Sequence, residues 1–140
     1  MSQPATARPL TAVRTTVTPT ATTSDIVISQ PQPVDLVIYR GDSGRFRVSV
    51  TDPNNAPLDV SGAVWNCQIR QMPDDTITMA TLTVQPVSGD VSSVDCILTA
   101  QQSALLNNTL AYWDLEMILG GETQTLLSGK CNITLDVSRP

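Results

Sequence analysis

Alternation of apolar and polar residues is the feature that most limits how this chain can fold. Between residues 34 and 137, short runs place an apolar side chain at every second position, and turn-forming residues separate the runs. A period of two puts these side chains on one face of a β-strand, so the region is predicted to be all-β. In the clearest run, 111–119, Trp113, Leu115 and Met117 share the apolar face, while Asp114 and Glu116 lie on the other.

Turn signals divide this region into about seven or eight short strands, the number expected of an antiparallel β-sandwich. Pairs such as Gly120-Gly121 favour tight hairpin turns. A single short helix is expected at 100–108, about two turns long. Each sheet should bury one face. The expected strands are 34–40, 45–51, 63–70, 76–84, 94–99, 111–119, 123–128 and 131–137.

All three cysteines fall on predicted inward faces, together with Trp65 and Leu135. Their odd number and the lack of a C-x-x-C spacing argue against a disulfide framework or a zinc site. We therefore expect Cys67, Cys96 and Cys131 to be reduced, small core residues in a protein made in a cytoplasm. Trp65 and Trp113 are expected to be buried with them.

The composition changes near Pro33. Residues 1–33 contain five prolines and eight threonines but no aromatic residue or glycine, so we predict an extended N-terminal arm (1–33) ahead of a folded domain (34–140). The arm carries a net charge of +1 and the remainder -6, within a total of -5. Its apolar patch, Ile26, Val27 and Ile28, is the predicted anchor for strand addition to a neighbour. A leader with no role is the alternative.

Catalytic chemistry is poorly represented. The chain has no histidine, which excludes His-based triads, and it has no glycine-rich nucleotide motif, so we predict neither enzymatic activity nor a cofactor. Asp114 and Glu116 share one strand face, but we interpret them as solvated or interface charges rather than a catalytic pair. The Arg40-Gly41-Asp42 tripeptide is interpreted as a strand-ending turn. Asp74-Asp75 lacks the calcium-loop spacing, so no metal site is predicted.

The charge and hydropathy patterns also limit the possible partners. A net charge of -5 makes nucleic acid an improbable ligand, since such binders usually present a basic face. No apolar run reaches the roughly 18 residues that span a bilayer. The first ten residues lack an apolar signal-peptide core, so no secretory route is predicted.

Several motifs, taken in order, resemble small structural proteins of tailed bacteriophages. Residues 35–43 (DLVIYRGDS) precede a strand and a turn, and 57–62 (PLDVSG) follow, before a strand that contains a tryptophan. The later 112–116 (YWDLE) and 127–130 (LSGK) also fit the pattern. The similarity covers about 35–137, and this region is similar to the N-terminal domain of upper baseplate proteins and to other Ig-like virion domains. The resemblance implies an Ig-like β-sandwich and a structural role in a virion.

The resulting hypothesis is a non-enzymatic virion protein, made in the host bacterial cytoplasm and present in many copies or as a homo-oligomer. Its expected partners are other virion proteins, either the major capsid protein, which it would decorate as a cement protein, or tail and baseplate proteins. The alternative is a module that binds a glycan or protein on the host surface. That module would need an exposed aromatic platform.

Overall fold

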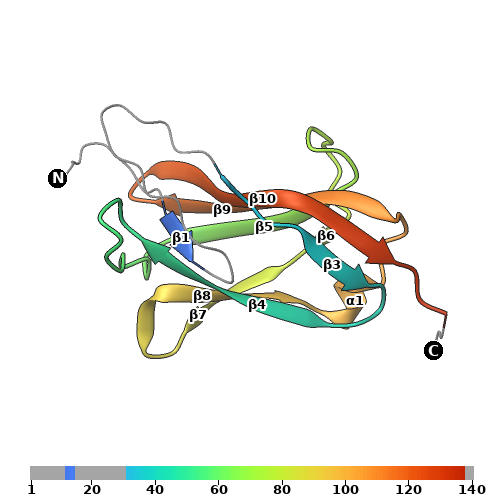
Figure 1. Cartoon of the computed structure of the whole chain (residues 1–140), viewed down its shortest axis with the longest axis horizontal. Helices are drawn as coiled ribbons and strands as arrows, with labels where there is room; N and C mark the ends of the chain where they lie inside the picture. Colours follow the sequence, from blue (N-terminus) through green and yellow to red (C-terminus); the bar gives the residue numbers. More distant parts are fainter. Residues whose placement is uncertain (1–11, 15–30, 138–140) are drawn as a thin grey trace.

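The protein is mostly β-structure arranged in two sheets (Figure 1). The structure, a computed structural model, describes residues 12–14 and 31–137. Two of its ten strands, β1 and β2, come from the segment predicted to be the arm. The elements are β1 (Ala12–Arg14), β2 (Gln32–Pro33), β3 (Leu36–Tyr39), β4 (Gly44–Thr51), β5 (Val64–Arg70), β6 (Ala80–Thr81), β7 (Thr83–Val87), β8 (Asp90–Leu98), α1 (Ala100–Ser103), β9 (Leu110–Leu119) and β10 (Glu122–Thr134).

The chain crosses repeatedly between the two sheets. The four-stranded sheet has the order β1-β4-β8-β7, and the six-stranded sheet has the order β2-β10-β9-β5-β6, with β3 also paired to β10. Neighbouring strands are antiparallel except that β2 and β3 run parallel to β10. Hairpins join β7 to β8 and β9 to β10, and the connections β2–β3 and β5–β6 also stay within one sheet. The other connections pass from one sheet to the other (Figure 1). The all-β prediction is therefore confirmed.

The predicted apolar faces of β4, β8 and β9 form the core between the sheets. Trp113 is 3% exposed, and its ring packs edge-on against Phe46 at a centroid distance of 5.4 Å, so it joins β9 to β4 of the other sheet. A pair of this geometry adds about 0.5–1.5 kcal/mol beyond the area it buries. The other buried side chains that the alternation predicted are Val48, Val50, Val94, Leu98, Leu115 and Met117.

All three cysteines are buried and unpaired, as predicted. A hydrogen bond with Cys96 and burial raise the pKa of Cys67 well above its ordinary value. Burial, helped by the nearby Asp35 charge, raises the pKa of Cys131 to about 12. The Cys67 and Cys131 thiols are therefore protonated at neutral pH and behave as small apolar residues rather than nucleophiles.

Some predicted elements differ from the structure because local pairing changes. The predicted strand 76–84 is divided, since Ala80–Thr81 pairs with β5 of one sheet and Thr83–Val87 with β8 of the other. The inward alternation continues through this switch, which is why the sequence reads as one strand. Residues 76–79 precede the ladder, and Ile77 is 73% exposed.

The helix and the chain end also differ from prediction. Thr99 caps α1 by accepting a hydrogen bond from the Gln102 backbone, but the helix ends after one turn and Leu106 enters the core. The predicted strands 123–128 and 131–137 are one strand, β10, which ends at Thr134. Leu135 and Val137 were predicted to face inward, and this is wrong, because the ladder has ended and both side chains are exposed. Trp65, expected to be buried, is only partly so.

Candidate binding surfaces

The N-terminal segment contacts both sheets, and its attachment to β10 is specific. β2 and β3 line the β10 edge, and between them the Val34 amide donates to the Ser128 carbonyl at 2.9 Å. The Val34 carbonyl accepts from Trp113 Nε1 at 2.8 Å, and Asp35 Oδ1 accepts from the Lys130 amide at 3.0 Å. A buried indole N–H normally finds such a partner. Backbone and side-chain bonds therefore hold residues 32–39 in one position.

Gly129 makes this close approach possible. A Cβ atom added there would lie 2.0 Å from the Val34 carbonyl oxygen and 2.7 Å from its carbon. No side chain fits at such a distance, so glycine is required for the two backbones to meet. The sequence prediction missed this role, because Gly129 lies inside a long strand rather than in a turn.

The attachment to the other sheet is much smaller. β1 pairs with the edge of β4 through three residues, with Ala12 opposite Thr51, Val13 opposite Val50 and Arg14 opposite Ser49. On its opposite side β4 pairs with β8 from residue 44 to 49. Among the described residues, no strand pairs with the β1 side of β4 between residues 44 and 48.

The predicted anchor of the arm, Ile26, Val27 and Ile28, lies outside the described residues. Its role therefore stays a prediction. The structure describes a different edge strand from this segment, further toward the N-terminus, in which Ala12–Arg14 pairs with β4 of the same chain. No period-2 signal singled out this strand, because it is short and sits in a Thr/Pro-rich stretch.

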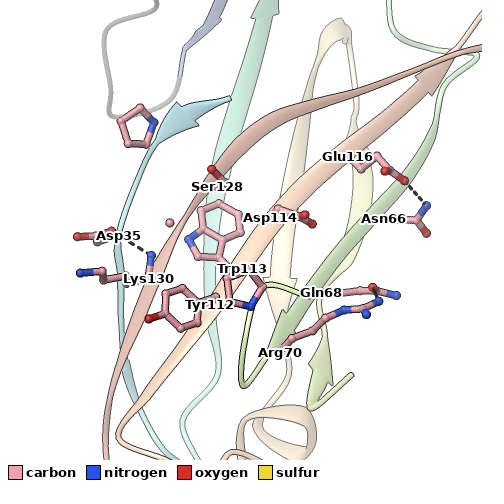
Figure 2. A pocket seen from close by; sticks show the side chains of 13 residues that line it. Asp35, Asn66, Gln68, Arg70, Tyr112, Trp113, Asp114, Glu116, Ser128 and Lys130 are labelled. Carbon is pink, nitrogen blue, oxygen red and sulfur yellow. Dashed lines mark hydrogen bonds between the residues drawn. The ribbon is translucent and has the colours of Figure 1, made fainter. Parts of the chain in front are cut away.

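A depression of about 690 Å³ lies on the outer face of the six-stranded sheet (Figure 2). Its floor is formed by outward side chains of β5, β9 and β10, and its walls include the segment around Asp35 and the turn at Pro73. This volume falls within the usual range of small-ligand sites. The lining residues with polar or aromatic side chains include Asn66, Gln68, Arg70, Tyr112, Asp114, Glu116 and Lys130.

Most polar groups on this floor are already partnered. Asn66 Nδ2 donates to Glu116 at 3.1 Å (Figure 2). Arg70 donates to Gln68 Oε1 at 2.6 Å and to the Asp75 carbonyl. Partial burial, reinforced by the Glu116 charge, raises the pKa of Asp114.

The depression can therefore accept a polar or cationic group. Asp114 and Glu116 lie on the polar face of β9, as predicted. Sequence alternation found that face, but not the walls, which come from segments distant in sequence.

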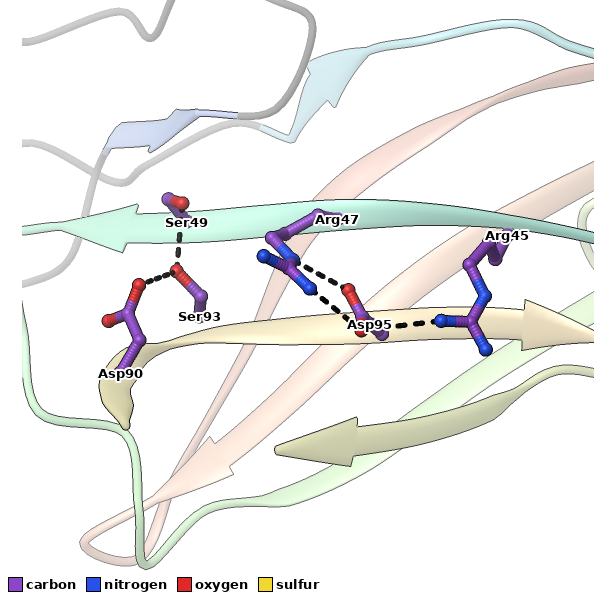
Figure 3. A network of polar contacts seen from close by, with 6 residues as sticks. All are labelled: Arg45, Arg47, Ser49, Asp90, Ser93 and Asp95. Atoms are coloured by element: carbon purple, nitrogen blue, oxygen red, sulfur yellow. Dashed lines mark hydrogen bonds and ion pairs between the residues drawn. The ribbon is translucent and has the colours of Figure 1, made fainter. Parts of the chain in front are cut away.

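The outer face of the four-stranded sheet carries a compact polar network (Figure 3). Asp95 accepts two hydrogen bonds from Arg47, at 2.8 and 3.2 Å, and also pairs with Arg45 at 3.8 Å. The Arg47 hydrogen bond is the main reason that the pKa of Asp95 is lowered. Nearby, Ser49 and Ser93 share a hydrogen bond of 2.9 Å. The charges of Arg45, Arg47 and Asp95 are therefore paired with one another across β4 and β8.

The Arg40-Gly41-Asp42 tripeptide lies in the turn between β3 and β4, as predicted. Gly41 has a φ of 93°, which favours glycine, and its amide donates to Ser103 Oγ at 2.9 Å. Arg40 forms an ion pair with Asp136 at 2.6 Å, and both side chains are largely covered. An arginine held in this way supports a structural role for the tripeptide.

Within residues 12–14 and 31–137, no group of three or more His, Cys, Asp or Glu residues could hold a metal ion. No helix there is long and apolar enough to cross a membrane.

The fold and surfaces thus define a mostly β protein with two sheets, an edge-pairing N-terminal segment and a polar depression. No model of a known protein family matches the chain, and no curated protein does either. Among solved structures, the chain is similar to domains 4 and 5 of the S-layer protein SbsC, with a TM-score of 0.41 and 13% sequence identity. The match covers 79% of this chain and 51% of that one, and at this TM-score it identifies neither a family nor a function.

Proposed function

We propose that the chain is a non-enzymatic structural component of a tailed-phage virion, which binds neighbouring virion proteins through a β-sandwich and an N-terminal arm. The expected partners are the major capsid protein or tail and baseplate proteins. The motifs at 35–43 and 57–62 support this class through their resemblance to phage structural domains. A role in capsid decoration and a role in the tail or baseplate are both consistent with these motifs.

The strand order supports the Ig-like form of the proposed sandwich. The order β1-β4-β8-β7 corresponds to strands A-B-E-D of an immunoglobulin domain, and β10-β9-β5 corresponds to G-F-C. The chain departs from antibody domains because Cys67 follows Trp65 in sequence and its thiol is unpaired. The dense packing of Trp113 against Phe46 takes the place of a disulfide between the sheets.

The observation that carries the proposal is the pairing of Ala12–Arg14 with an exposed sheet edge. Strand addition uses backbone hydrogen bonds and therefore tolerates many partner sequences. A small acidic domain has limited area for a stable interface, which typically buries about 1,200–2,000 Å² in total. An arm that adds strands to its neighbours increases that area.

The test compares the full chain with a variant that lacks residues 1–30. The deletion stops at residue 30, because β2 at Gln32–Pro33 belongs to the β10 edge and should remain. Both forms are mixed with particles that lack this protein and are then challenged with salt and heat. We expect the truncated form to fold but to be lost from the particles more readily. Equal retention of the two forms would contradict an arm that holds neighbours.

The depression supports a second candidate function, binding of a host-surface glycan or protein. Tyr112 lies beside carboxylate, amide and guanidinium groups there, a combination suited to sugar hydroxyls. Trp113 also borders the depression, but it is only 3% exposed, and Phe46 packs against the core. Titration with a glycan panel, followed by NMR, tests this function. Shifts confined to Tyr112 and its neighbours, and abolished by Tyr112→Ala, would favour it over the virion-assembly proposal.

A further inference from the structure

We propose that the depression on the outer face of the six-stranded sheet is a docking site for an arginine side chain of a neighbouring protein, with Asp114 as its carboxylate partner. The inference rests on the proposed function, because it names the chemistry of a partner that the sandwich binds. It concerns the folded domain and requires nothing of the N-terminal arm. At about 690 Å³, the depression has room for a guanidinium group and the aliphatic chain that carries it.

Asp114 occupies the centre of the depression floor. In the register of the sheet it lies opposite Gln68 of β5 and Ser128 of β10. Along β9 it lies between Tyr112 and Glu116, and all four of these neighbours line the depression. No residue that the structure describes donates a hydrogen bond to the Asp114 carboxylate, which stays accessible to solvent. The central group of the floor is therefore an acceptor that lacks a donor from the described residues.

The two cationic side chains of the lining are directed elsewhere. Arg70 uses its terminal nitrogens for hydrogen bonds to the Asp75 carbonyl and to Gln68 Oε1. Lys130 points away from Asp114, toward the opposite side of the depression (Figure 2). Neither of these two cations therefore forms an ion pair with Asp114.

The surroundings of the depression carry an excess of negative charge. The turn at its wall, closed by a hydrogen bond from the Asp75 amide to the Met72 carbonyl at 3.1 Å, adds two carboxylates beside Pro73. Five carboxylates and two cations then surround the depression, an excess of three negative charges: Asp35, Asp74, Asp75, Asp114 and Glu116 against Arg70 and Lys130. The network on the other sheet, by contrast, balances two arginines with two aspartates (Figure 3). Charge therefore selects a cationic partner for the depression.

The same imbalance acts on Asp114 itself. Desolvation by partial burial, followed by the Glu116 charge, raises the pKa of Asp114, and Arg70 opposes this less strongly. A cation beside Asp114 would replace the lost solvation of the carboxylate and offset its repulsion from Glu116. A carboxylate that is destabilised in this way inside a depression is typical of a binding site rather than of a structural ion pair.

The chemistry of the floor favours guanidinium over ammonium. A carboxylate accepts two parallel hydrogen bonds from the planar guanidinium group, which an ammonium group cannot offer. Tyr112, two residues from Asp114 on the same face, supplies an aromatic ring against which a guanidinium stacks favourably.

Exposed apolar side chains beside the depression indicate that the arginine belongs to a polypeptide. In the row beyond Tyr112, Leu110 of β9 and Val37 of β3 lie on either side of Asn132. Val37 is 82% exposed and Leu110 is 41% exposed. Leu110 lies four residues from Asp114, about 13 Å along an extended strand. An extended segment with arginine at Asp114 can therefore place an apolar residue, four positions away, against these side chains.

An NMR titration of the isotope-labelled full-length chain tests the inference. The probe is a nine-residue peptide with arginine at its centre, leucine at both ends and threonine elsewhere. Both ends are capped, so the peptide carries a single positive charge. Citrulline, the neutral isostere of arginine, replaces it in the control peptide. We expect amide shifts at residues 66–70 and 112–116, and at least about tenfold weaker binding of the citrulline peptide.

Two variants of the chain test the role of Asp114. Asp114→Asn keeps the shape of the side chain but removes its charge, so the arginine peptide should bind about tenfold more weakly. This variant should fold, because the ionised form of Asp114 destabilises the domain. Glu122→Gln is the matched control, since it removes one negative charge from the exposed start of β10, outside the lining. Its affinity should stay within about twofold of wild type, because charges outside the depression are screened.

Four results would overturn the inference: no binding of the arginine peptide, equal affinity for the citrulline peptide, equal losses in the two variants, or shifts confined to residues outside the depression. A third peptide, with serine in place of both leucines, should bind about threefold more weakly, because it buries less apolar area. Undiminished binding of that peptide would overturn the choice of a polypeptide as the partner. These titrations use no virion particle, so their failure is distinct from failure of the particle-retention experiment.

Discussion

The N-terminal segment attaches to the two sheets in very different ways. On the β10 edge, β2 and β3 are held by ladder bonds, by the bond from Trp113 to the Val34 carbonyl and by Asp35, and Gly129 makes room for them. On the β4 edge, β1 has three ladder pairs. The first attachment includes a hydrogen bond from the buried Trp113 and is therefore part of the domain's fold. The second rests on the pairing of a three-residue strand at a sheet edge.

The largest expected effect in this comparison comes from Trp113→Ala. The change removes a buried aromatic ring between the sheets and the donor to Val34, so it should lower the free energy of unfolding by about 3–5 kcal/mol. Trp113→Phe is the matched control, since it keeps a ring but leaves the Val34 carbonyl without that donor. Urea denaturation should rank the variants as wild type, Phe, then Ala. Equal stability of wild type and Trp113→Ala would show that Trp113 does not join the sheets.

Gly129→Ala should have a smaller but clear effect on the same attachment. Its Cβ would lie 2.0 Å from the Val34 carbonyl oxygen, so the two backbones must separate. We expect a loss of about 1–3 kcal/mol, the usual cost of overpacking. Gly62→Ala is the control, because nothing lies within 4 Å of a Cβ added there. Thermal unfolding that leaves both variants at the wild-type midpoint would refute the close approach at Gly129.

The outer faces of the two sheets should respond to pH with opposite signs. Asp95 has a lowered pKa, so its stabilising effect is present above about pH 4 and is lost as pH falls through the folded-state value. Asp114 has a raised pKa, so its ionised form destabilises the fold and protonation relieves this. At pH 7, Asp95→Asn should lower the melting temperature and Asp114→Asn should raise it. Both differences should shrink on acidification, and shifts of the same sign would contradict these assignments.

The smallest expected effect is on stability when the weaker attachment is disrupted. Val13→Pro removes one donor from a three-residue strand at a sheet edge, so the free energy of unfolding should change by no more than about 0.5 kcal/mol. Chemical denaturation at low protein concentration measures this. A loss comparable to that of Gly129→Ala would show that β1 is an integral strand of its own domain.

Strands with one buried face were the part of the fold that the sequence could predict. Alternation identified the inward residues of β4, β8 and β9, because period 2 directly reports which face is buried. It was wrong at Leu135 and Val137, where the apolar pattern outlasts the ladder. The alternation also made β6 and β7 look like one strand. The apolar pattern continues through Leu82, while the pairing partner changes from β5 to β8.

The candidate sites were harder to predict, because they depend on tertiary approach. The sequence placed Asp114 and Glu116 on an outward face, but the walls of the depression come from residues near 33–35 and 73. The sequence around Gly129 gave no signal that glycine is needed there. The need comes from the close approach of the Val34 backbone, which is distant in sequence. The arm was predicted from composition alone, and composition cannot state which short piece of residues 1–33 pairs with which sheet edge.

Native-state hydrogen exchange resolved to single amides tests the contrast between the two attachments most directly. The amide of Val34, bonded to Ser128, should be protected nearly as well as the core, at every protein concentration. The amides of Ala12–Arg14 should exchange much faster than that of Val34, because β1 is a short strand at a sheet edge with three ladder pairs to β4. Protection of β1 equal to that of Val34 would contradict the account.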